Sequence, residues 1–401
     1  MTEKTQRNRN LKIYLLLFAL LAAVLFSSFG SSMNITERAL VHAMGIDPTE
    51  NGGFKVTMQV FKTSGAGSDT PVDVSQPNVE VITAEGETVS SAIDDARNQM
   101  GKDIFLGHLQ MICFSPEIDF SDPEELFQFA LKDKNIYLGV NICLSETTAE
   151  EIMNAQMTRG TTSAEAMKQI LEMNIKNSAA IKCEIIDMMS TIDTPQNILI
   201  PVMAVRQNEE QSEGQSGNQE QSGQSGGQEQ GGGQSGGQSP QIVVTSTAII
   251  KDGKTLDTRL NAEQAAGVAW LTRQANQSSL VVPHRGELVN VRLTKDSSSV
   301  KLENRDGRVI YRTKLVLLAH TTKDLNTKEE SDEMASEVKQ RLQEILSSAQ
   351  QTAFYDSGAD VFGVWRLLRH SYPIAYLKYK DNLQDIYAVT DFETELIIRV
   401  E

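Results

Sequence analysis

The 401-residue chain contains only three cysteines, Cys113, Cys143 and Cys183. Three cysteines are too few for the disulfide framework of a small exported domain. Each lies in an apolar stretch, such as LQMICF or GVNICL. We therefore expect three buried thiols rather than a disulfide bridge or a reactive nucleophile.

The sequence also lacks the short motifs that hold metals or phosphates, or that present a catalytic nucleophile. Its five histidines never pair at ligand spacing, and no HExxH, Cys-x-x-Cys, GxSxG or P-loop occurs. Adjacent carboxylates such as Asp94 and Asp95 point about 100° apart on a helix, so we expect them to be solvated. His108, in LGHLQM, is the one residue considered as a catalyst, and a structural histidine is the preferred interpretation. We expect no catalytic residue, no cofactor and no metal site, and therefore no enzyme.

Positive charge is scarce as well. The chain has 37 Lys and Arg against 53 Asp and Glu, which gives a formal net charge of −16. Nucleic acids, anionic lipids and acidic wall polymers all carry negative charge. This balance argues against nucleic acid and against electrostatic docking on anionic surfaces.

One long apolar run, Ile13 to Phe29, is present near the N-terminus, and it follows a basic flank made of Lys4, Arg7, Arg9 and Lys12. A basic flank stays in the cytoplasm, so the chain after Ser31 is expected on the other side of the membrane. The run is longer than a signal-peptide core of about 7 to 15 residues, and it lies at the short end of the roughly 17 to 25 that span a bilayer. Ser28-Phe29-Gly30 is a candidate cleavage site, so a cleaved signal and a retained anchor both stay open. No cysteine lies directly after the run to accept a lipid.

Strand and helix patterns alternate in residues 33–160, which predicts an N-terminal α/β domain. Residues 54–60 alternate apolar and polar side chains as a half-buried strand does, and Asp122 followed by Pro123 predicts the start of a helix. We place a middle domain at residues 161–282, with a helix capped by Asn261 and Gln264 in its second half.

The middle domain is interrupted by a Gln/Gly/Ser-rich tract, residues 207–240. The tract has no apolar side chain to bury except its closing proline, so we predict that it is disordered. Strands are predicted on both sides of it. An enlarged hairpin loop is favoured over a domain boundary, because lengthening a surface loop costs little free energy.

Residues 283–401 are predicted to form a C-terminal α+β domain. Three strands come first, the last two joined by an Asp306-Gly307 turn, and the segment ETELIIRV closes the chain as a strand. A long helix from about Lys328 to Phe354 aligns five apolar residues on one face: Met334, Val338, Leu342, Ile345 and Ala349. The overall prediction is an α+β (mixed α/β), multi-domain protein with a C-terminal antiparallel sheet covered by a long helix, after an N-terminal signal or anchor at residues 1–32.

Several stretches together resemble the C subunits of bacterial spore germinant receptors, the Ger(x)C type. They include RALVHAMGID, FKVTMQV and GHLQMICF, and the helix pattern Glu-x-x-x-Gly-x-x-Trp-Leu formed by Glu263, Gly267, Trp270 and Leu271. Asp360 and Phe362-Gly363 match a further segment near the C-terminus. The resemblance runs from about Thr36 to the end, apart from the Gln/Gly/Ser-rich tract, and the order and spacing of the stretches make it specific.

The resemblance implies a three-domain, non-enzymatic protein on the outer face of the plasma membrane, or spore inner membrane. It would work with a polytopic membrane subunit and a transporter-like subunit in a receptor complex, assisting assembly or signal transmission in response to small nutrients. Family members carry a lipidated cysteine after the leader, and residues 27–32 contain none. The apolar run marked by Ile13, Leu20 and Phe29 is therefore expected to be the membrane anchor. An exported solute-binding module or hydrolase with the same architecture is the alternative.

Overall fold

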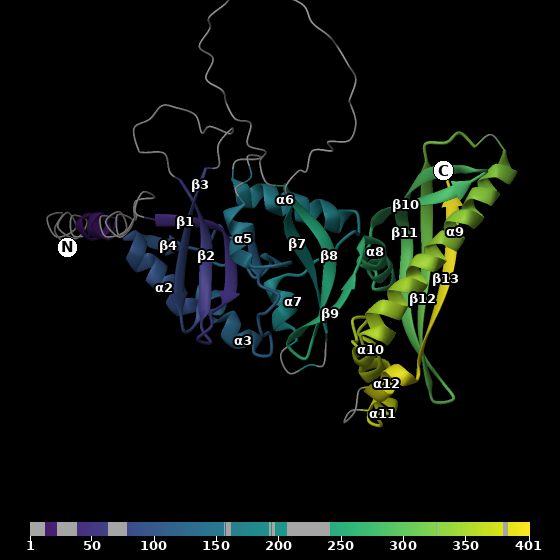
Figure 1. Cartoon of the computed structure of the whole chain (residues 1–401). Helices are drawn as coiled ribbons and strands as arrows, with labels where there is room; N and C mark the ends of the chain where they lie inside the picture. The colour runs from purple at the N-terminus through teal and green to yellow at the C-terminus, as the bar shows by residue number, and fades with distance from the viewer. Residues whose placement is uncertain are drawn as a thin grey trace, which may run out of the picture.

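The computed structural model describes residues 13–21, 38–62, 78–155, 157, 162–191, 194, 197–206, 241–325, 327–379 and 384–401. These residues form two β-sheets flanked by helices (Figure 1). The larger sheet has nine strands and the smaller has four. Both contain parallel and antiparallel neighbours, so the predicted α+β class is confirmed.

The large sheet is built from residues on both sides of the Gln/Gly/Ser-rich tract. Its strands are β1 (Arg38–Pro48), β2 (Phe54–Phe61), β3 (Val79–Gly86), β4 (Asp103–Phe105), β5 (Met111–Phe114), β6 (Asn141–Ser145), β7 (Ile198–Arg206), β8 (Gln241–Lys251) and β9 (Lys254–Leu260). The order across the sheet is β3-β2-β1-β5-β6-β7-β8-β9, and β4 pairs with β1. Strands β1, β5, β6 and β7 run parallel, whereas both outer parts of the sheet are antiparallel hairpins.

The strands on either side of the tract pair directly with each other. β7 and β8 are antiparallel neighbours, and Arg206 lies opposite Gln241. The interpretation of an enlarged hairpin loop is confirmed for the ends of the tract, while the tract itself lies outside the described residues. The sheet also runs through the expected boundary near residue 160, because β6 pairs with β7. The division into three domains stays a prediction.

Helices cover both faces of the large sheet. They are α2 (Val89–Met100), α3 (Pro123–Leu126), α4 (Gln128–Lys132), α5 (Ala149–Asn154), α6 (Ser163–Lys176) and α7 (Ile185–Met189). One apolar core lies under α2, α4 and α7, and a second lies under α5 and α6. The predicted helix start at Asp122 is confirmed, since its side chain accepts the Glu125 N–H at 2.9 Å and Pro123 begins α3.

The three cysteines lie in these two cores as free, buried thiols, as predicted. Burial in apolar surroundings raises the pKa of the Cys113 and Cys183 thiols well above the usual value. Thiols that are both inaccessible and protonated do not act as nucleophiles.

The small sheet follows helix α8 (Ala262–Leu271) and contains β10 (Gln277–His284), β11 (Glu287–Arg305), β12 (Arg308–Thr321) and β13 (Thr390–Val400). The two strands predicted before the Asp306-Gly307 turn are one continuous strand, β11, and β10 was not predicted. β11 pairs antiparallel with β12 as predicted and with β10 on its other side, whereas β13 runs parallel to β12 and makes the sheet mixed. The chain returns to the starting end of β12 through a helical crossover, and such a crossover joins parallel strands.

The predicted long helix begins at Thr327, whose side chain caps α9 (Lys328–Gln350), and it covers one face of the small sheet (Figure 1). All five residues of its predicted apolar face are buried. The helix continues as a π-helical segment, η2 (Gln351–Asp356), and the crossover is completed by α10 (Val364–Ser371), α11 (Pro373–Tyr376) and α12 (Gln384–Ala388).

Candidate functional site

The junction between the two sheets is the candidate functional site, and helix α8 is its centre. The predicted capping box starts this helix. Gln264 N–H donates to Asn261 Oδ1 at 2.9 Å, and Asn261 N–H donates to Gln264 Oε1 at 3.0 Å. These bonds satisfy backbone groups that a helix otherwise leaves without a partner.

Helix α8 packs tightly on α9 because Gly267 has no side chain. A Cβ at this position would lie 2.5 Å from the Cβ of Ala349 and 3.0 Å from the Ile345 carbonyl oxygen. Beside this contact, Arg341 of α9 forms an ion pair with Glu263 of α8 at 2.6 Å. The close approach fixes the position of one helix on the other.

The C-terminal end of α8 is held by the small sheet. Trp270 is buried, and its Nε1 donates to Ser278 Oγ in β10 at 3.0 Å. The Tyr311 hydroxyl of β12 donates to the Leu271 carbonyl oxygen at 3.2 Å, and burial raises the pKa of this phenol.

The same helix also reaches the large sheet. Leu199 of β7 and Ile249 of β8 belong to one continuous apolar core with Trp270 and Leu271. Helix α8 therefore contacts both sheets. Two residues of the Glu-x-x-x-Gly-x-x-Trp-Leu pattern, Glu263 and Gly267, hold α8 on α9. The other two, Trp270 and Leu271, lie in the core that both sheets share.

Asp360 and Phe362-Gly363, the other motif residues, form the turn that begins α10. Asp360 is completely buried, and its two carboxylate oxygens accept the Val364 and Trp365 N–H groups at 2.9 and 2.8 Å. Burial raises the pKa of Asp360, and these backbone hydrogen bonds oppose the rise. Gly363 has a φ of +69°, in the left-handed region that glycine tolerates without strain. The Asp360 hydrogen bonds and the left-handed conformation of Gly363 both fix the backbone at the start of α10.

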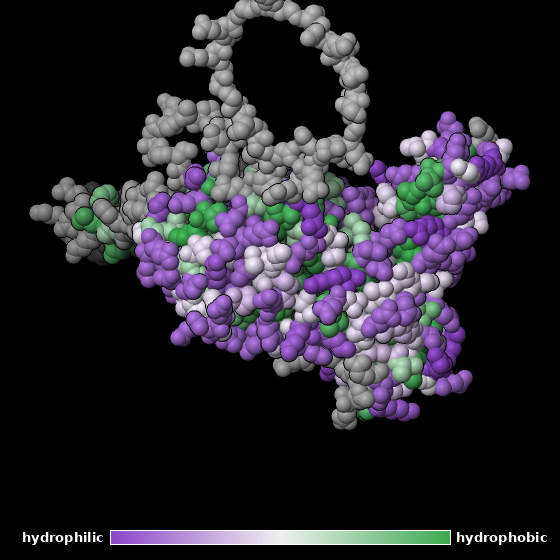
Figure 2. Space-filling model, in the orientation of Figure 1, coloured by the Kyte–Doolittle hydropathy of each residue, from purple (hydrophilic) through white to green (hydrophobic). Residues whose placement is uncertain are grey.

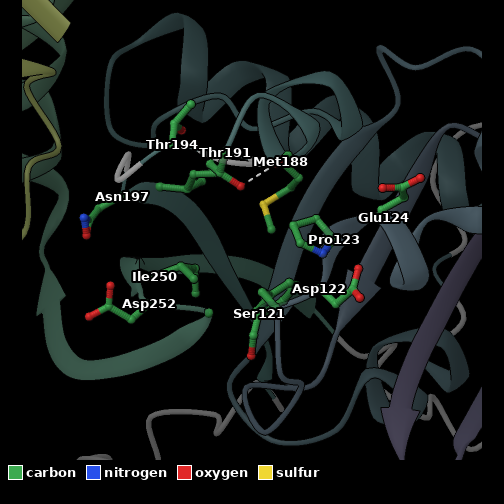
Figure 3. A pocket seen from close by; sticks show the side chains of 13 residues that line it. Ser121, Asp122, Pro123, Glu124, Met188, Thr191, Thr194, Asn197, Ile250 and Asp252 are labelled. Carbon is green, nitrogen blue, oxygen red and sulfur yellow. Dashed lines mark hydrogen bonds between the residues drawn. The ribbon is translucent and has the colours of Figure 1, made fainter. Parts of the chain in front are cut away.

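A separate cavity of about 480 Å³ opens beside the large sheet (Figure 3). It lies between the start of α3, the end of α7 and the turn that joins β8 to β9. The turn approaches α3 closely, since Phe120 N–H donates to the Gly253 carbonyl oxygen at 2.7 Å. The polar lining is acidic and hydroxylated: Ser121, Asp122, Glu124, Thr191, Thr194, Asn197 and Asp252. Such a lining suits a small solute that carries hydrogen-bond donors or positive charge.

The interpretation of His108 as a structural histidine stays a prediction. His108 is exposed in a turn before β5, with its ring 5.6 Å from the ring of Phe105 and 6.1 Å from that of His42. Sequence reasoning overlooked His284, which is buried and has its Nδ1 2.7 Å from Glu337 Oε2 in α9. The alternation in QSSLVVPH was the available signal, because it places His284 on the same face as Leu280 and Val282.

The described residues contain no cluster of three or more His, Cys, Asp or Glu side chains that could hold a metal ion. Of the three expected anchor residues, Ile13 and Leu20 lie in a helical segment, residues 13–21, with 51% and 62% of their surfaces exposed. Phe29 lies outside the described residues. Within the described ranges, no helix is both long enough and apolar enough to cross a bilayer.

Two family models match most of the chain. The spore germination protein N-terminal domain matches residues 31–205, and the spore germination B3/GerAC-like C-terminal domain matches residues 245–401. A crystal structure of the GerBC protein has the same fold, with a TM-score of 0.54 and 14% sequence identity over 89% of this chain and 96% of that one. No curated protein matches the chain. The two family models together show that this chain belongs to the GerAC-like family of spore germination proteins.

Proposed function

We propose that this chain is the non-enzymatic, extracytoplasmic C subunit of a spore germinant receptor. It assists assembly of the complex or transmits a signal through it in response to small nutrients, together with a polytopic subunit and a transporter-like subunit. Family membership supports a place in the spore germination machinery. The α8 junction is the observation that carries the more specific role.

A subunit that passes on a conformational change needs a stiff element in contact with both of its halves. Helix α8 has this property, because its apolar side chains share one core with β7, β8 and the small sheet. Close-packed interiors transmit displacement instead of absorbing it. A shift of the large sheet would therefore move α8, and α8 would move α9 and the small sheet.

The test separates transmission from assembly by changing the contact between α8 and α9. We expect Gly267→Ala to push α9 away, because the new methyl group meets the Cβ of Ala349 at 2.5 Å. The germination rate should fall while the complex still co-purifies from spore membranes. Adding Ala349→Gly removes the obstructing methyl group and should restore part of the rate.

One outcome would count against the receptor role, and another would count against transmission through the α8 junction. A clean deletion of the gene that leaves germination with every nutrient normal would exclude a receptor role. A Gly267→Ala protein that fails to co-purify, although its thermal unfolding is unchanged, would assign the junction to assembly instead of transmission.

An exported solute-binding module is the second candidate, with a hydrolase as a variant of it, and the acidic cavity of Figure 3 favours it. A specific, saturable rise of several degrees in melting temperature with one metabolite would support solute binding. Asp252→Asn should abolish that rise if the ligand occupies the cavity. Asp306→Asn is the matched control, because both aspartates have a φ of +50° before a turn glycine and only Asp252 lines the cavity.

A further inference from the structure

Helices α10 and α11 form a protruding end of the molecule, at the bottom of the view in Figure 1. This end exposes two large aliphatic side chains, Ile374 at 81% and Leu377 at 60%. Arg366 and Arg369 of α10 and Lys378, which follows α11, are exposed as well. We call these five residues the α10–α11 tip.

The cations of the tip differ from most arginines on the small sheet. Arg305, Arg308 and Arg312 all form ion pairs with carboxylates of β11 or β13. In the part of the chain that the structure describes, no carboxylate lies within ion-pair distance of Arg366, Arg369 or Lys378. Among the described residues, the tip therefore carries positive charge that no carboxylate neutralises, in a chain whose net charge is −16.

The arrangement of side chains is amphipathic. Val364, Trp365 and Leu368 of α10 face the core, so Arg366 and Arg369 lie on the opposite side of the helix. Three half-buried tyrosines pack at the base of the tip: Tyr372, Tyr376 and Tyr379. Tyrosines, exposed aliphatic residues and free cations together are typical of segments that lie at a membrane interface.

We propose that the α10–α11 tip docks on an anionic lipid bilayer. Ile374 and Leu377 enter the headgroup region, and Arg366, Arg369 and Lys378 contact lipid phosphates. A lipid bilayer is fluid and can adapt its surface to a protruding end of the protein. Figure 2 shows apolar surface at this lower end of the molecule. The remaining negative charge opposes docking weakly, because charges more than about 8 Å from the lipid are screened at physiological salt. This contact goes beyond the receptor role and does not depend on it.

The buried cysteines make a direct test possible. Cys113, Cys143 and Cys183 are at most 1% exposed, so a cysteine introduced at the surface becomes the reactive thiol. Leu377→Cys in the full chain is labelled with an environment-sensitive fluorophore and reconstituted in phosphatidylcholine vesicles with or without phosphatidylglycerol. The matched control is Leu288→Cys. Leu288 is 79% exposed and lies outside the tip, near the start of the 19-residue β11.

We expect a blue shift and quenching by lipid-bound quenchers at position 377, in the anionic vesicles only, and neither at position 288. Arg369→Gln with Lys378→Gln should lower the docking equilibrium constant on the order of 25-fold, about fivefold for each cation removed. Arg305→Gln with Lys314→Gln removes the same charge from the sheet face and should leave docking unchanged.

Three results would overturn the proposal. Equal shifts at positions 377 and 288 would indicate non-specific adhesion. A shift that does not depend on phosphatidylglycerol would remove the role of the cations. A shift in native spore membranes but in no lipid vesicle would assign the tip to a protein partner.

Discussion

Asp360 illustrates how a buried carboxylate serves the backbone instead of chemistry. Burial raises its pKa above the unfolded value of about 3.9. A raised folded-state pKa means that the stability due to this group is fully present below about pH 4, and is lost as the pH rises through the folded-state value. Asp360→Asn removes the titration and one hydrogen-bond acceptor, at a cost of about 1–3 kcal/mol. In urea unfolding at several pH values, the gap between wild type and variant should be widest below pH 4. A gap that widens toward neutral pH would show that the Val364 and Trp365 N–H groups outweigh burial.

At the scale of elements, the β7–β8 hairpin determines what happens when the Gln/Gly/Ser-rich tract is removed. Arg206 and Gln241 lie directly opposite each other, so an Asn-Gly turn can replace residues 207–240 without moving either strand. We expect the free energy of unfolding to change by less than about 1 kcal/mol, because a shorter loop closes slightly more easily. Thermal unfolding of the full chain and the deletion measures this. Joining Arg206 directly to Gln241 is the control, and it should be less stable because opposed residues leave no room to reverse the chain. An insoluble Asn-Gly variant would contradict the prediction.

At the scale of the whole molecule, the expected membrane anchor, residues 13–29, makes a prediction that can be tested. If the run from Ile13 to Phe29 is the anchor, the native protein should keep its N-terminus and stay in the membrane pellet through alkaline carbonate. Leu20→Arg should cost about 2.5–3.5 kcal/mol of insertion and reduce membrane integration, whereas Leu20→Ile should not. N-terminal sequencing of the native protein distinguishes a retained anchor from a cleaved signal peptide. A mature chain that begins at Ser31 would exclude the anchor.

Local patterns in the sequence predicted individual elements well and their pairing less well. The apolar face of α9 and the capping box at Asn261 depend on residues three to seven positions apart, so both were predictable. The parallel docking of β13 beside β12 and the continuity of β6 with β7 depend on distant segments, and no local pattern reports them. The α10–α11 tip was overlooked for a different reason, because a net charge averages over the chain and hides a local excess of cations.

The parallel pairing of β13 has a consequence for the order in which the chain folds. β13 joins β12 only after the segment from Thr321 to Thr390 has been closed, and closing a long segment makes a contact form late. Until then the edge of β12 presents unpaired backbone groups, and the core under α9 lacks Leu396. A ribosome that stops before Thr390 thus releases a chain with an open sheet edge, the kind of surface that leads to aggregation. We therefore expect a chain truncated before Thr390 to aggregate more readily than the full chain.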